Sequence, residues 1–95
     1  MKYSIKYGKV VEKFLRKHTV IAPKVMAKLE ILAENPYENN LDIAKLEGYE
    51  QHYRLRVGKY RILYEIIDTQ ILIYAYDADS RGDIYKQRII YIFDI

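Results

Sequence analysis

Alternating and helical spacing of apolar residues divides the first part of the chain into a strand and a helix. Residues 2–7, KYSIKY, alternate between polar and apolar side chains and predict a strand that ends at Gly8. Residues 9–18 predict a helix with a basic outer face and an apolar stripe made of Val10, Val11, Phe14, Leu15 and His18. We expect His18 to be a capping or core residue.

A second helix is predicted over residues 21–35. Pro23 is compatible with it because this proline falls in the first turn, and Asn35-Pro36 ends the helix. Its apolar stripe consists of Ala22, Val25, Met26, Leu29, Leu32 and Ala33. Because the turn between the two helices is short, they should form a helical hairpin.

The second half of the chain predicts a loop followed by strands. Residues 36–51 are polar and are interpreted as a loop that Leu41, Ile43 and Leu46 anchor to the core. Strands are predicted over residues 52–57, 60–67 and 70–78. Two-residue turns at Gly58-Lys59 and Asp68-Thr69 would join them as hairpins.

The register that these turns imply sorts the side chains onto two faces of the sheet. The apolar face should receive the helices and holds Leu55, Val57, Tyr60, Ile62, Tyr64, Ile66, Ile71, Ile73 and Ala75. The other face is basic and aromatic and holds His52, Arg54, Arg56, Arg61, Leu63, Leu72, Tyr74 and Tyr76. In this register Arg61 lies opposite Arg56 on one side and beside Tyr76 on the other. A one-residue slip would bury the arginines, which is too costly.

Together these elements predict one domain, residues 1–95, of the α+β class. A two-helix hairpin should pack on a mainly antiparallel four-stranded sheet, followed by a short C-terminal extension. The extension ends in IIYIF at residues 89–93, which fits either a strand or a packed terminal helix.

Composition narrows the class of protein. The absence of cysteine excludes a disulfide framework and a thiolate metal site, and no apolar run is long enough for a signal core or a bilayer span. We therefore expect a cytoplasmic protein that does not enter the membrane. The net charge of +3 is mild, yet five of the six arginines lie in the second half of the chain.

Three arginines on one face of a hairpin require an explanation, because like charges directly opposite each other destabilise a sheet. Guanidinium groups bind phosphate oxygens, and tyrosine rings stack on unpaired bases. Arg54, Arg56 and Arg61 therefore predict a nucleic-acid site, which Arg81 and Tyr85 could complete from the segment after the last strand. The alternative is that the arginines only pair with acidic residues, for which the candidates are Glu65, Asp77, Asp79 and Asp83.

Other catalytic arrangements have little support. Only His52 lies near the arginines, which disfavours a two-histidine ribonuclease mechanism. Asp77 and Asp79 alternate at a strand end and favour a turn or salt-bridge role over a metal site. The chain has neither a glycine-rich phosphate loop nor a Ser/His/Asp arrangement, and we expect no metal and no cofactor.

The stretch LEGYEQHYRLRVGKYRILYEI, followed by DADSRGDIYK, resembles the RelE/ParE superfamily of bacterial and archaeal toxins from toxin–antitoxin pairs. The resemblance covers nearly the whole chain, and its specific part is the hairpin together with Arg81 and Tyr85. It implies the RelE-like fold, a small α+β domain with two helices on a mainly antiparallel sheet.

RelE-like members cleave messenger RNA in the ribosomal A site without a metal, by attack of the RNA 2′-hydroxyl on the adjacent phosphate. The resemblance implies that Arg56 and Arg61 bind the scissile phosphate and stabilise its additional negative charge in the transition state. It implies that Arg81 stabilises the leaving 5′-oxygen or acts as the acid, and that Tyr85 stacks on a base or orients the 2′-hydroxyl. Arg54 matches a further basic position. We assign RNA contacts to Lys59, Tyr74, Tyr76 and Lys86.

The general base is where this chain departs from the family. A typical RelE has lysines on the strand before the turn, and an ungapped match puts His52 and Arg54 at two of these positions. An arginine rarely gives up its proton, whereas surrounding arginines would keep the His52 imidazole neutral, as a base requires. The alternative is a surface histidine at the start of the strand. Tyr85 is the second candidate base, because neighbouring cations favour ionisation of a phenol.

Three functions remain open at this point. The first is a type II toxin that cleaves mRNA on the ribosome and is held inactive, in a heteromeric complex, by a cognate antitoxin covering the basic face. The second is a ParE-type inhibitor of DNA gyrase without nuclease activity; ParE relatives tend to lack the full arginine and terminal-tyrosine set. The third is a decayed toxin that only binds its antitoxin. Apolar surface around Leu63, Leu72 and the IIYIF tail also suggests that a partner covers the chain.

Overall fold

A computed structural model of the protein describes residues 2–80. The predictions for Arg81, Tyr85 and Lys86, and for the segment 89–93, lie outside these residues. Neither helix of the described part has the length and apolar character that crossing a membrane requires.

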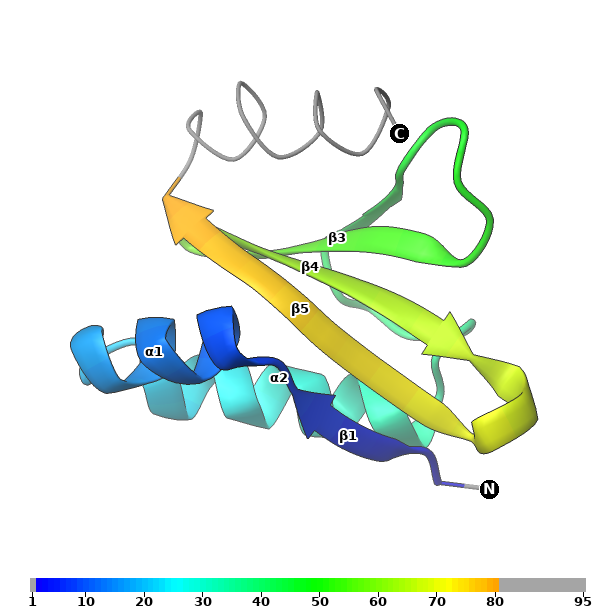
Figure 1. Cartoon of the computed structure of the whole chain (residues 1–95), viewed down its shortest axis with the longest axis horizontal. Helices are drawn as coiled ribbons and strands as arrows, with labels where there is room; N and C mark the ends of the chain where they lie inside the picture. The colour runs from blue at the N-terminus through cyan, green and yellow to red at the C-terminus, as the bar shows by residue number, and fades with distance from the viewer. Residues whose placement is uncertain (1, 81–95) are drawn as a thin grey trace.

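Two helices and a five-stranded mixed sheet make up the fold (Figure 1). The elements are β1 (Ser4–Tyr7), α1 (Lys9–Lys17), α2 (Ala22–Glu34), β2 (Ile43–Lys45), β3 (His52–Val57), β4 (Tyr60–Ile67), the 3-10 turn η1 (Asp68–Gln70) and β5 (Leu72–Ser80). The strand order is β1-β5-β4-β3-β2, with β1 parallel to β5 and the other neighbours antiparallel. The predicted α+β class with a helical hairpin on a mainly antiparallel sheet is confirmed.

The prediction of four strands was wrong by one within the described residues, because the segment interpreted as a loop contains β2. Ile43–Lys45 pair with β3 at the edge of the sheet. Three residues carry too little alternation to predict a strand, so hydrogen bonding to β3 decides their conformation. The anchoring role is confirmed for Leu41 and Ile43, which pack against the main core.

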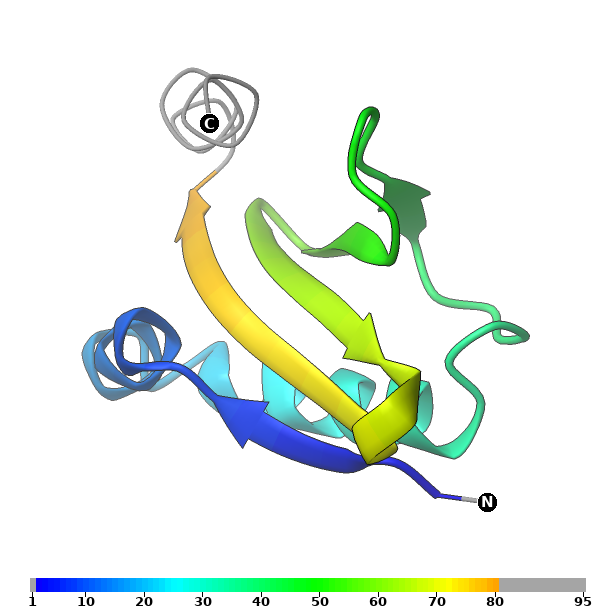
Figure 2. The ribbon, with the colours of Figure 1, turned by 45° about the vertical axis from the view of Figure 1, so that its right-hand side comes forward.

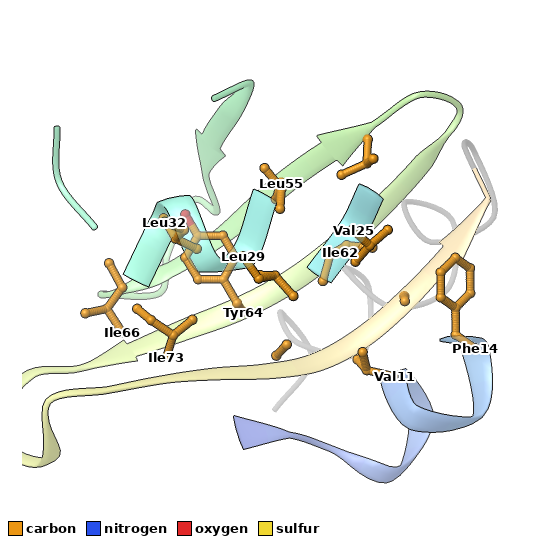
Figure 3. Packing of buried hydrophobic residues seen from close by; sticks show 13 residues of the cluster. Val11, Phe14, Val25, Leu29, Leu32, Leu55, Ile62, Tyr64, Ile66 and Ile73 are labelled. Atoms are coloured by element: carbon orange, nitrogen blue, oxygen red, sulfur yellow. The ribbon is translucent and has the colours of Figure 1, made fainter. Parts of the chain in front are cut away.

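Both helices cover the same face of the sheet, and the hydrophobic core lies between the helices and that face (Figures 2 and 3). The fully buried side chains include Val11, Val25, Leu29, Leu32, Leu55, Ile62, Tyr64 and Ile73. Two stripe residues were wrongly expected to be buried, since Val10 is 47% exposed and Met26 is 44% exposed. A helix that rests on a twisted sheet buries a narrower stripe than its apolar spacing alone suggests.

The turn between β4 and β5 is longer than predicted. In place of a two-residue turn at Asp68-Thr69, η1 and then Ile71 connect the strands, and Ile67 is paired with Leu72. Ile71 has a φ of 49°, in the left-handed region, and it is not part of the core. A β-branched residue rarely adopts that conformation, so the local sequence gives no sign of this turn.

A β-bulge then shifts the register in the middle of β5. Tyr64 is paired with Ala75, whereas its neighbour Leu63 is paired with Asp77, so Tyr76 is the extra residue. A bulge of this kind reorients the side chains that follow it by one position.

The shift corrects the predicted neighbour of Arg61, which lies opposite Asp79 rather than beside Tyr76. Directly paired residues share a face of the sheet. Asp77, paired with Leu63, and Asp79, paired with Arg61, therefore lie on the same face as the arginines.

Candidate functional site

The β3–β4 hairpin positions three arginines on the face of the sheet away from the helices. Its turn at Gly58-Lys59 is the predicted one, and Gly58 has a φ of 61°, which favours glycine. Arg56 is paired directly with Arg61, as the alternation predicted. Arg54 and Arg61 are only 7% and 5% exposed, whereas Arg56 is more open to solvent.

One carboxylate that the sequence analysis did not select lies between two of these arginines. Asp42 Oδ1 is 3.2 Å from Arg54 Nη2, and Asp42 Oδ2 is 3.6 Å from Arg56 Nε. The backbone carbonyl of Asp42 also accepts a hydrogen bond from the Arg56 N–H at 2.9 Å. Asp42 immediately precedes β2, so it reaches the arginines only because β2 pairs with β3. Its position in a polar segment carried no signal of this role.

Two acidic residues of β5, Asp77 and Asp79, lie on the same face as the arginines. Asp77 is buried and accepts a hydrogen bond from the Ala78 N–H at 2.9 Å, while Asp79 accepts one from the Ser80 N–H at 2.8 Å. Asp79 is the cross-strand partner of Arg61. The face is therefore basic with carboxylates between the arginines. This arrangement agrees with the predicted nucleic-acid site and also with part of the alternative, in which the arginines pair with acidic residues.

His52 lies at the other end of β3 and contacts a phenol and a carboxylate. Its Nδ1 is 2.9 Å from the Tyr76 hydroxyl, and its Nε2 is 3.8 Å from Glu65 Oε2. The rings of Tyr49 and Tyr76 meet the imidazole edge to face at 5.7 and 5.5 Å. The sequence placed His52 and Tyr76 on one face, but it did not predict their hydrogen bond, because the longer turn between β4 and β5 moves Tyr76 away from Arg61 and toward Leu63.

Tyr76 is part of a small apolar cluster on this face. It packs with Leu46 against Leu63, which is fully buried. The expectation that Leu63 would expose apolar surface is therefore wrong. Burial raises the pKa of the Tyr76 hydroxyl, and the nearby charges of Asp77 and Glu65 raise it further.

Two other predicted contact residues, Lys59 and Tyr74, lie at different distances from the arginines. Lys59, in the hairpin turn, has its Nζ 5.6 Å from the centre of the Tyr60 ring. The Tyr74 ring faces Lys6 at 5.7 Å, and its hydroxyl lies so close to Gly8 that a Cβ there would meet it at 3.0 Å. Lys59 is thus near the Arg56 and Arg61 end of the hairpin, whereas Tyr74 lies toward β1.

The described residues contain no group of three or more His, Cys, Asp or Glu side chains that could hold a metal ion. The polar side chains described on this face are guanidinium groups, carboxylates, phenols and one imidazole.

Comparisons with known proteins cover most of the chain. The family described as the ParE toxin of type II toxin–antitoxin systems, parDE, matches residues 5–85. A Methanocaldococcus jannaschii protein that carries the name of a RelE toxin is 33% identical over 91 residues, which cover 90% of this chain and 98% of that protein.

Solved structures give the same picture. A chain of an archaeal RelE–RelB complex from Pyrococcus horikoshii superposes with a TM-score of 0.73 at 29% identity, covering 86% of this chain and 98% of that one. A chain of the RelB–RelE antitoxin–toxin complex from Methanococcus jannaschii gives a TM-score of 0.68 at 30% identity, covering 85% and 95%.

Proposed function

Because this chain belongs to the RelE/ParE superfamily of type II toxins, we propose that it is a RelE-type endonuclease that cleaves mRNA on the ribosome. The cleavage would be metal-independent and would proceed by attack of the RNA 2′-hydroxyl on the scissile phosphate. The single observation that carries this proposal is the pairing of Arg56 with Arg61 on a face where Arg54 and Arg61 are largely buried.

The arginine pair favours an anionic ligand for an electrostatic reason. Two guanidinium groups directly across a β-ladder repel each other, and a phosphate between them would turn that repulsion into attraction. In the transition state the phosphorane carries more negative charge than the ground state, so Arg56 and Arg61 would contribute several kcal/mol of selective stabilisation. Arg54, held by Asp42, would contribute positive charge and keep the hairpin face rigid.

The remaining roles are proposed from the resemblance. Arg81 would stabilise the leaving 5′-oxygen or protonate it, and Tyr85 would stack on a base or orient the 2′-hydroxyl. Lys59, Tyr74, Tyr76 and Lys86 would contact the RNA.

We further propose a cognate antitoxin as partner. The archaeal relatives with known structure are RelE–RelB complexes, in which the toxin is bound to its antitoxin. By analogy, an antitoxin segment would cover the basic face of this chain and inactivate it in a heteromeric complex.

A ParE-type inhibitor of DNA gyrase is the second candidate, because the matching family description names ParE. The two candidates differ in what the arginines are for. An endonuclease needs Arg56 and Arg61 to bind the reacting phosphate, whereas a gyrase inhibitor does not.

Arg61→Ala is the decisive variant. Loss of one charge-stabilising donor should slow cleavage by about 100-fold or more and relieve growth arrest. Primer extension on transcripts after induction would measure cleavage, and Arg16→Ala, an exposed arginine on α1, is the matched control. Undiminished toxicity of Arg61→Ala would overturn the phosphate assignment. Intact transcripts together with inhibited gyrase supercoiling would favour the ParE-type function.

A further inference from the structure

Three adjacent strands bring a carboxylate, an imidazole and a phenol together on the outer face. Glu65 on β4 is the cross-strand partner of His52 on β3, and its Oε2 is 3.8 Å from His52 Nε2. On the other side of the ring, His52 Nδ1 is 2.9 Å from the hydroxyl of Tyr76, the bulged residue of β5. Both ring nitrogens of His52 therefore face groups of the protein itself.

The chemistry of the three groups assigns the protons. Glu65 Oε2 lies 3.8 Å from His52 Nε2, too far for a hydrogen bond, but a carboxylate at this distance attracts an N–H rather than a lone pair, so we assign the proton of the neutral ring to Nε2. Nδ1 is then the acceptor, and the Tyr76 hydroxyl donates its proton to it. A histidine in this state has no free lone pair for a substrate, whereas the Tyr76 oxygen keeps lone pairs that can accept a proton.

The surroundings keep Tyr76 as a neutral phenol. Tyr76 packs on Leu63 in the small apolar cluster, and Asp77 and Glu65 both disfavour a second negative charge nearby. The raised pKa of Tyr76 means that no tyrosinate is available in advance. Tyr76 can take up a proton only if it passes its own proton on to His52.

We propose that Glu65, His52 and Tyr76 form a proton relay in which Tyr76 is the group that accepts the proton of the attacking 2′-hydroxyl. This proposal rests on the proposed endonuclease function. As the bond between the 2′-oxygen and phosphorus forms, the 2′-hydroxyl proton moves to the Tyr76 oxygen and the Tyr76 proton moves to His52 Nδ1. The bond between phosphorus and the 5′-oxygen breaks, and the 5′-oxygen takes a proton from an acid or from water.

The relay leaves an imidazolium ion that faces a carboxylate. Glu65 stabilises that charge, and the ion returns its proton to solvent after cleavage. Glu65 and His52 act through Tyr76 and are positioning residues. The charged and titratable groups around His52 and Tyr76 are Tyr49, whose ring contacts His52, Glu65, which is paired with His52, and Asp77, which follows Tyr76; Arg54 is the next residue of β3 on the same face.

The proton assignment can be tested without any cleavage. Nitrogen-15 NMR of the His52 ring in the purified full-length toxin should show a protonated Nε2 and an Nδ1 that accepts a hydrogen bond. Tyr76→Phe should shift the Nδ1 signal, whereas Tyr53→Phe, on the same sheet but bonded to Gln51, should not. A proton on Nδ1 in the neutral wild-type ring would overturn the direction of the relay.

Single-turnover cleavage on programmed ribosomes, measured across pH, tests the catalytic part. Tyr76→Phe should slow cleavage by about 100-fold or more. His52→Gln should slow it and change its pH profile, while Tyr53→Phe should keep both rate and profile. Thermal unfolding of each variant checks that it folds.

The outcomes separate the relay from the proposed function. If the wild type cleaves and Tyr76→Phe matches its rate and pH profile, the relay is wrong, and a slow His52→Gln variant would then make His52 the direct base. A folded wild type that cleaves no mRNA overturns the endonuclease function and the relay with it.

Discussion

At the scale of single residues, the acidic side chains decide how much positive charge the hairpin offers to a ligand. Asp42 lies within ion-pair distance of both Arg54 and Arg56, and its own side chain is largely exposed. Exposed ion pairs contribute little to stability because water and salt screen them. The effect of Asp42 should therefore be greater on ligand binding than on folding.

Asp42→Asn tests this competition. Removing the carboxylate takes one negative charge away from Arg54 and Arg56, so the affinity for a short single-stranded RNA should rise and depend more steeply on salt. Fluorescence anisotropy at two salt concentrations measures both quantities. Glu38→Gln, an exposed acid in the same polar segment, is the matched control. Equal affinities of wild type and Asp42→Asn would show that Asp42 does not compete with RNA.

At the scale of elements, one carboxylate links several segments by hydrogen bonds at the end of the sheet opposite the Gly58-Lys59 turn. Asp68, which begins η1, accepts hydrogen bonds from the hydroxyls of Tyr3 and Tyr37, both at 2.7 Å, and from Gln51 Nε2 at 2.8 Å. These bonds join the segments before β1, after α2 and before β3. They lower the pKa of Asp68, while burial and the bond to Asp68 raise the pKa of Tyr37 to about 12.

This network predicts a pH dependence of stability. A carboxylate whose pKa is lowered by folding stabilises the fold above its ordinary pKa of 3.8, and this contribution is lost as the pH falls through the lowered value. Asp68→Asn lacks that titration, so its deficit relative to wild type should be largest near neutrality and shrink in acid. Urea unfolding at several pH values measures the deficit. A deficit that stays constant with pH would contradict the assignment.

The predictions for the elements succeeded where the signal is local. Helical spacing located α1 and α2, and the glycine turn together with alternation located β3, β4 and the pairing of Arg56 with Arg61. The failures concern β2, η1 and the bulge. Each of these depends on hydrogen bonds to a neighbouring strand or turn rather than on periodicity within its own few residues.

At the scale of the whole molecule, the helical hairpin and the sheet are two layers that pack against each other. Leu29 of α2 is fully buried against the sheet (Figure 3). Met26, three residues earlier, is 44% exposed. Close packing of this kind means that a lost side chain leaves a cavity that the surrounding structure cannot fill.

Leu29→Ala should therefore lower the free energy of unfolding by about 2–5 kcal/mol. Met26→Ala is the matched control and should change it by less than about 1 kcal/mol, because its side chain leaves solvent only in part. Urea unfolding monitored by circular dichroism measures both changes. Similar losses for the two variants would mean that α2 presents a different face to the sheet.

Local periodicity and turn chemistry determine the class of fold, the helical hairpin and the common face of the three hairpin arginines, because each depends on residues within a few positions of one another. The contacts of that face were decided only by the tertiary structure. Asp42 reaches Arg54 through the pairing of β2 with β3, and His52 meets Tyr76, 24 residues away, through the register of β5 on β4. Such contacts depend on how strands from distant parts of the chain are aligned, and a one-residue shift in that alignment changes every partner.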